Sequence, residues 1–131
     1  MASEAIGDLK QFFSSLGGLH DVRIDSISID VDRQTLEFAT YNINAAFTNP
    51  GDPDCRPATL IFEGVNSFFM DVDMENEGIR ITDVAFVAGA AVQRLEIDLN
   101  EGGGKMSRGR RSLIINFKSL QVQYGEPSSS S

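Results

Sequence analysis

The chain has 131 residues, a formal net charge of −8, 41% hydrophobic residues and 23% charged residues. This length fits one domain, since two independent cores would each bury too little apolar surface, and the composition excludes wholesale disorder. No apolar run approaches the roughly 18 residues that span a bilayer, and no basic segment precedes a long apolar one, so we expect neither a membrane span nor a secretory signal. Cys55 is the only cysteine. It excludes a disulfide framework and a multi-cysteine zinc site, and it suits a cytoplasmic protein.

The charge is unevenly distributed along the chain. Residues 1–104 hold 18 acidic and 6 basic side chains, whereas residues 105–118 hold five basic side chains and no acidic one. An acidic body repels phosphate backbones, so we expect no nucleic-acid partner. The basic segment is typical of a solvated loop, with the alternative that Arg108, Arg110 and Arg111 bind an anionic partner.

The first 16 residues carry the spacing of a helix. Ile6, Leu9 and Leu16, with Phe12 or Phe13, recur at intervals of three and four, which predicts a helix over residues 3–16. Ser3 suits the N-cap and Gly17-Gly18 suits the end of the helix. We expect this helix to pack on one end or face of a sheet.

From residue 21 to residue 124 the apolar residues alternate with polar ones, which is typical of half-buried antiparallel strands. The segments amount to about seven strands, spaced as in a sandwich or a partly open barrel. A change of phase near Asp25-Ser26 predicts a bulge, Gly64 suggests another, and the phase shifts again around Lys118-Ser119. The predicted fold is therefore mainly β, as a single domain over residues 1–124 with a disordered tail over 125–131.

His20, the only histidine, stands beside Asp21 just before the first predicted strand. A histidine next to a carboxylate suits a general base. Neighbouring residues of an extended chain point to opposite faces, however, and no nucleophile accompanies them. We therefore expect a structural role for His20 and Asp21 at the junction of helix and strand, and no enzymatic activity.

Two further segments resemble ligand sites only superficially. Asp71, Asp73, Glu75 and Glu77 could supply oxygen ligands, but Gly78 comes too late for a calcium loop and the alternation is that of a solvated strand face. Residues 102–107 contain three glycines and a lysine, but a methionine stands where a phosphate loop needs Ser or Thr. We expect no metal and no cofactor.

The aromatic residues are nine Phe and two Tyr, mostly at core positions of the predicted strands. Phe68 and Phe69 are adjacent, so one of the two faces away from the core. An exposed Phe69 would indicate a contact surface.

A hydrophobic-His-Asp start, a hairpin and a strand of the form L-x-F-x-G-V follow one another in the first half of the chain. They fall on Leu19-His20-Asp21, on Ile24, Ile27, Asp30 and Leu36, and on residues 60–65. Over about residues 16–66 this pattern resembles small bacterial proteins that include some immunity-protein families of toxin systems. The resemblance implies a non-enzymatic cytoplasmic protein that binds and blocks a toxin.

The sequence therefore favours a non-enzymatic protein-interaction domain, with toxin neutralisation as its most concrete form. The candidate contact residues are Asp30, Asp32, Asp71, Asp73, Glu75, Phe69, Arg108, Arg110 and Arg111. Two alternatives stay open: a β-barrel or sandwich that holds a small ligand, with Arg110 or Arg111 at its mouth, and a homo-oligomer that pairs through strand edges.

Overall fold

The computed structural model describes residues 3–48, 55–71, 79–99 and 111–125. These residues form nine strands, one α-helix and one 3-10 helix. The helices are α1 (Leu9–Ser15) and η1 (Gly17–Leu19). The strands are β1 (Ser3–Ala5), β2 (Arg23–Asp30), β3 (Thr35–Thr40), β4 (Ala58–Glu63), β5 (Ser67–Asp71), β6 (Ile79–Val87), β7 (Gln93–Leu99), β8 (Arg111–Phe117) and β9 (Ser119–Tyr124).

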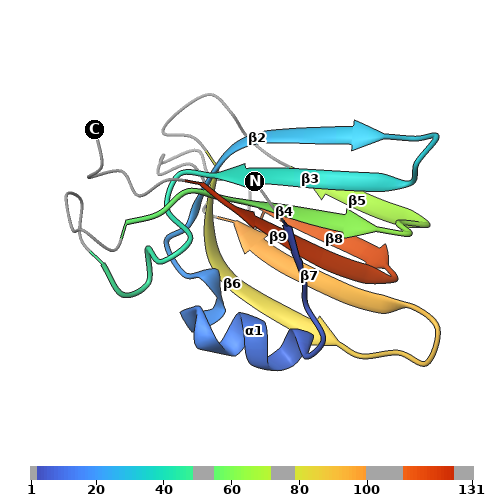
Figure 1. Ribbon diagram of the computed structural model, residues 1–131, viewed down its shortest axis with the longest axis horizontal. Coiled ribbons are helices and arrows are strands. Elements are labelled where there is room, and N and C mark those ends of the chain that lie inside the picture. The colour runs from blue at the N-terminus through green and yellow to red at the C-terminus, as the bar shows by residue number, and fades with distance from the viewer. Residues whose placement is uncertain (1–2, 49–54, 72–78, 100–110, 126–131) are drawn as a thin grey trace.

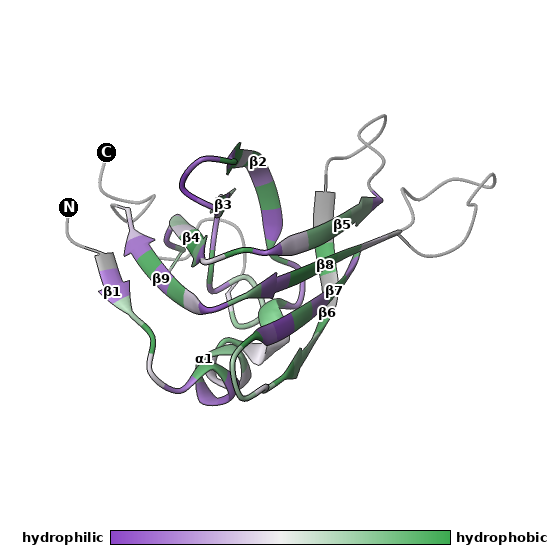
Figure 2. Cartoon of the chain, turned by 90° about the vertical axis from the view of Figure 1, so that its right-hand side faces the viewer, coloured by the Kyte–Doolittle hydropathy of each residue, from purple (hydrophilic) through white to green (hydrophobic). Residues whose placement is uncertain are grey.

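The strands build two antiparallel layers. One runs in the order β1-β9-β4-β3-β2 and the other in the order β6-β7-β8-β5. In Figure 1, β5 and β8 pass behind β3 and β4, and α1 lies below beside β6. Hydrophobic and hydrophilic residues alternate along several of the strands, as Figure 2 shows for β2 and β9. The predicted mainly β, antiparallel, sandwich-like fold with one packed helix is confirmed.

One end of the sandwich is closed by two strands that bend together from one layer into the other. β4 leads into β5 and β8 leads into β9, and β4 pairs with β9 on one side of the corner while β5 pairs with β8 on the other. The register changes by one residue between the pairs Glu63↔Ser119 and Ser67↔Asn116. Gly64 takes a φ of +65° there, in the left-handed region that favours glycine. The bulge expected at Gly64 is thus confirmed.

The other end is closed by β6, which curves across it (Figure 1). β6 pairs with β2 only through Arg23↔Arg80 and Ile24↔Ile79, and then pairs with β7. The register of β2 against β3 shifts between Ile24 and Ser26, so the predicted bulge lies where β2 leaves β6. Beyond this bulge, β3 is the only strand among the described residues that pairs with β2.

Three phenylalanine rings form the centre of the core. The Phe62 ring lies 5.4 Å from that of Phe38 and 4.9 Å from that of Phe117, both edge-to-face. All three side chains are fully buried, and burying each one stabilises the fold by about 2–3 kcal/mol. They come from both layers and thereby hold the sandwich together.

The helix is shorter than the sequence predicted. α1 begins after Asp8, whose carboxylate accepts a hydrogen bond from the Gln11 amide at 3.0 Å, so Asp8 and not Ser3 is the N-cap. Ser3–Ala5 instead pairs with β9 as an edge strand. The prediction of a helix over residues 3–16 is wrong at its start, since the apolar spacing from Ile6 onward does not reveal a strand that packs beside β9.

The strand number also differs from the expected seven. β1 is additional, and at Lys118, where the sequence shows a shift of phase, the chain divides into β8 and β9, which lie in different layers. β3 ends at Thr40, and Ile43 is fully buried in the turns that follow.

Candidate binding cleft

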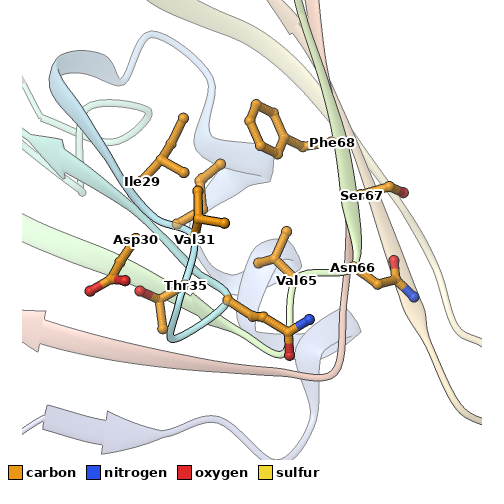
Figure 3. Close-up of a pocket in the computed structure, with 10 residues that line it drawn as sticks. Ile29, Asp30, Val31, Thr35, Val65, Asn66, Ser67 and Phe68 are labelled. Carbon is orange, nitrogen blue, oxygen red and sulfur yellow. The ribbon is translucent and has the colours of Figure 1, made fainter.

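A cleft of about 410 Å³ opens between the tip of the β2–β3 hairpin and the start of β5. Figure 3 shows the Phe68 ring projecting from β5 toward Ile29 and Val31 of the hairpin. The lining residues are Ile29, Asp30, Val31, Gln34, Thr35, Leu36, Val65, Asn66, Ser67 and Phe68. The cleft therefore has apolar walls and a polar rim.

The walls are exposed because, among the described residues, the second layer does not cover the end of β2. Ile29 lies opposite Leu36 in the β2–β3 ladder, on the face that also carries the core. Leu36 is 1% exposed, whereas Ile29 is 47% exposed and Val31 is 81% exposed. Leu36 and Val65 thus form a buried floor, and Ile29 and Val31 form an apolar wall that stays open to solvent.

Phe68 forms the opposite wall. It pairs with Ile115 on the inner face of β5 and β8, and 42% of its surface is exposed. Its neighbour Phe69 pairs with Ile114 on the outer face and is 55% exposed. The expectation that one of the two faces away from the core is confirmed for Phe69.

The hairpin tip is fixed by local hydrogen bonds. The Arg33 amide donates to the Asp30 carboxylate at 3.1 Å, and the Gln34 amide donates to the Val31 carbonyl at 3.2 Å. The Val65 amide donates to the Gln34 carbonyl at 2.8 Å, which ties the tip to the corner between β4 and β5. These bonds fix the hairpin tip relative to the corner between β4 and β5, so the two walls of the cleft are already in place before a ligand binds.

The hairpin beside the cleft is acidic. Residues 25–37 contain four carboxylates and one arginine. Arg33 lies 3.9 Å from Asp30 but is 82% exposed, so this ion pair contributes little. The hairpin therefore keeps a negative field that favours a cationic partner.

The structure brings only some of the predicted contact residues together. Asp30 and Asp32 lie at the hairpin tip, with Asp30 on the rim of the cleft, whereas Asp71 lies at the other end of β5. Asp73, Glu75, Arg108 and Arg110 lie outside the described residues. The backbone of Arg111 opens β8 opposite Leu99, but its side chain is outside the described part.

His20 and Asp21 lie on the surface at the junction of η1 and β2. The His20 Nε2 is 3.6 Å from the Asp21 carboxylate, and both side chains are more than half exposed. Asp21 takes a positive φ of +67° and its amide donates to the Ile81 carbonyl at 2.8 Å. This main-chain contact ties the segment before β2 to β6.

A second hollow, of about 570 Å³, lies between the start of α1 and the connection of β6 to β7. Asp8, Phe86 and Gln93 contribute to its lining. The Gln93 amide oxygen accepts from the Gly89 amide at 3.3 Å, and the Asp8 carboxylate caps α1, so these polar groups already serve the fold.

Within the described part of the chain, no three His, Cys, Asp or Glu side chains gather closely enough to hold a metal ion. In the same part, neither helix has the length and hydropathy to cross a membrane.

The sequence did not identify the cleft. Ile29 and Phe68 have the phase of core residues, and alternation marks only the face on which a side chain lies. Whether the other layer extends far enough to cover that face depends on the bend at Gly64, which alternation does not measure.

Compared with known proteins, the chain matches no family model and no curated protein. Its function is therefore inferred from the geometry of its own residues.

Proposed function

We propose that this chain is a non-enzymatic protein-interaction domain that binds its partner in the cleft between the β2–β3 hairpin and β5. One observation carries the proposal: Ile29, Val31 and Phe68 converge on one cleft and remain exposed above a buried floor. Exposed apolar side chains that cluster around a concavity are typical of protein contacts, in which a few such anchors supply most of the affinity.

The charge of the surroundings indicates the kind of partner. Asp30 lies on the rim of the cleft and Asp32 lies at the tip of the same hairpin, so a basic protein would be attracted from a distance and would bind faster at low salt. Toxin neutralisation is the most concrete form of this proposal. The resemblance of residues 16–66 to immunity proteins supports it, and an acidic inhibitor suits a basic nuclease.

Affinity capture with three versions of the chain tests the proposal. The wild-type chain and Phe69→Ala should retain the same partner, whereas Phe68→Ala should lose it. The two variants make a matched pair, since each removes one half-exposed ring from β5. Retention by all three, or loss with Phe69→Ala alone, would contradict binding in the cleft. If the purified partner has a toxic activity, addition of the wild-type chain should abolish it.

A small apolar ligand is the second candidate, because the volume of about 410 Å³ lies in the range of small-molecule sites. The same Phe68→Ala variant separates the two candidates. A small ligand that stabilises the wild-type chain against heat, but not Phe68→Ala, in the absence of any protein partner would favour ligand binding.

A further inference from the structure

We infer that the partner anchors itself in the cleft through an uncharged aromatic side chain that carries one hydrogen-bond donor, Tyr or Trp, with basic residues on either side of it. The ring packs against Phe68, and its O–H or N–H group bonds to the carboxamides of Gln34 and Asn66. This inference rests on the proposed function and specifies the part of the partner that enters the cleft.

The walls of the cleft suit a flat ring. The Phe68 ring is 42% exposed, and Figure 3 shows Ile29 and Val31 on the opposite wall. Leu36 and Val65 close the floor between them. A ring in this space contacts an aromatic side chain on one side and aliphatic side chains on the other. An aromatic anchor therefore buries more apolar surface here than a small aliphatic one.

Two carboxamides lie at the corner end of the same cleft. Gln34 and Asn66 both line it, and the 2.8 Å bond from the Val65 amide to the Gln34 carbonyl brings the two residues close together. Both residues are exposed, and within the described part of the chain neither carboxamide hydrogen-bonds to another residue. Each carboxamide can therefore accept a hydrogen bond from a ligand.

The backbone of Gln34 supports a role for its side chain. Gln34 takes a φ of +56°, in the left-handed region where glycine is unstrained and other residues are not. The main-chain bonds of the hairpin tip do not need a carboxamide at this position. Such strained residues concentrate at binding sites, and the cleft gives this one a function.

The polar groups of the lining favour a neutral anchor over a guanidinium. Asp30 provides the one carboxylate among the lining residues of the cleft, and this carboxylate accepts the Arg33 amide at 3.1 Å. Figure 3 shows it turned away from Phe68. A guanidinium between the apolar walls would lose hydration without a paired carboxylate. The single donor of Tyr or Trp needs only one amide oxygen.

The charge around the cleft favours basic residues beside the anchor. Asp30 lies on the rim and Asp32 at the exposed tip of the hairpin, and the chain as a whole carries −8. Lys or Arg next to the anchor would lie near these carboxylates in solvent, where they contribute modestly to affinity and chiefly to the rate of association. A second copy of this acidic chain fits the same surroundings less well.

A series of short peptides with blocked ends tests the anchor. Their form is Lys-Xaa-Lys, with Tyr, Trp, Phe, Leu or Arg at the centre, and each is titrated against the isotope-labelled full chain. The NMR shifts of the Ile29 and Val31 methyl groups give the affinity. Lys-Tyr-Lys should bind about fivefold more tightly than Lys-Phe-Lys, which lacks only the hydroxyl group. It should also bind about threefold more tightly than Glu-Tyr-Glu in low salt.

Substitutions on the protein locate the contact. Gln34→Met combined with Asn66→Leu removes both amide groups and keeps side chains of similar size, so it should abolish the preference for Lys-Tyr-Lys over Lys-Phe-Lys. Gln11→Met, at an exposed position of α1, is the matched control and should preserve that preference. Phe68→Ala should abolish the binding of both peptides, whereas Phe69→Ala should retain it. Thermal unfolding shows whether each variant is folded.

The outcomes separate the inference from the proposed function. Equal affinities of the Tyr and Phe peptides, or tightest binding by the Arg peptide, would overturn the inference, and a loss of binding in Phe68→Ala would still support the cleft. Absence of methyl shifts with every peptide would also overturn it, although capture of a protein by Phe69→Ala and not by Phe68→Ala would still support the proposed function. A dimer in light scattering that dissociates in Phe68→Ala would assign the cleft to a second copy and overturn the inference.

Discussion

Phe68 and Phe69 are neighbours in β5, yet their rings lie on opposite faces of the sheet, the first beside Ile115 and the second beside Ile114. Both rings are about half exposed, at 42% and 55%. Only Phe68 faces the hairpin across the cleft. This pair therefore separates the effect of losing an exposed ring from the effect of losing the cleft wall.

Substitution of the central core ring should be costly. In Phe62→Leu, both edge-to-face contacts, to Phe38 and Phe117, are lost and part of the ring volume becomes empty. We expect the free energy of unfolding to fall by about 2 kcal/mol, as measured by denaturant titration. Phe69→Leu, on the exposed face, should change it by less than about 0.5 kcal/mol. Equal losses would show that the three rings are not the centre of the core.

The corner between the layers depends on a glycine. A Cβ on residue 64 would lie 2.8 Å from the Lys118 side chain, and the φ of +65° disfavours any other residue. Gly64→Ala should therefore lower the free energy of unfolding by about 1–2 kcal/mol. Gly7→Ala is the control, because a Cβ there meets nothing within 4 Å. A neutral Gly64→Ala would contradict the described bend.

The start of α1 can be located by its cap. Asp8→Ala removes the acceptor for the Gln11 amide and should cost about 1 kcal/mol, whereas Asp8→Asn should retain most of the stability. Ser3→Ala should have little effect, since Ser3 belongs to β1 and not to a helix. Thermal unfolding of the three variants checks this, and a larger loss with Ser3→Ala would restore the longer helix that the sequence predicted.

Alkaline pH should weaken the fold through Tyr124. Burial raises the pKa of its phenol, the Glu4 carboxylate raises it further, and Arg56, whose guanidinium lies 4.6 Å from the ring centre, opposes the rise. Above pH about 10, Tyr124 ionises in the unfolded chain before it ionises in the folded one. The contribution of the neutral phenol to stability is therefore complete below that pH and is lost as the pH rises through the folded pKa.

Denaturant titrations over a range of alkaline pH check this expectation. Tyr124→Phe should flatten the decline, and Glu4→Gln should bring the phenolate absorbance change of Tyr124 to lower pH. A decline as steep in Tyr124→Phe as in the wild-type chain would assign the effect to other groups.

The sequence predicted the strand faces well and the arrangement in space less well. The phase shift at Asp25-Ser26 and the glycine at 64 correctly indicated bulges, because a change of phase has a direct backbone cause. β1 was missed because Ser3–Ala5 is too short to show a period.

The turns that follow β3 have an anchor that the sequence does not reveal. The buried Asn42 side chain accepts from the amides of Asn44 and Arg56, each at 3.0 Å, and donates to the Thr48 hydroxyl at 2.8 Å. No periodicity distinguishes this asparagine from an exposed one. The cleft was missed for a similar reason, since it depends on how far one layer extends over the other.

The affinity of one purified protein partner for Phe68→Ala and Phe69→Ala, measured by calorimetry beside the wild-type chain, tests the central claim most directly. Binding in the cleft predicts that Phe68→Ala weakens the complex at least about tenfold, while Phe69→Ala stays within about threefold of the wild-type value. Equal affinities for the two variants, or a larger loss for Phe69→Ala, would contradict it.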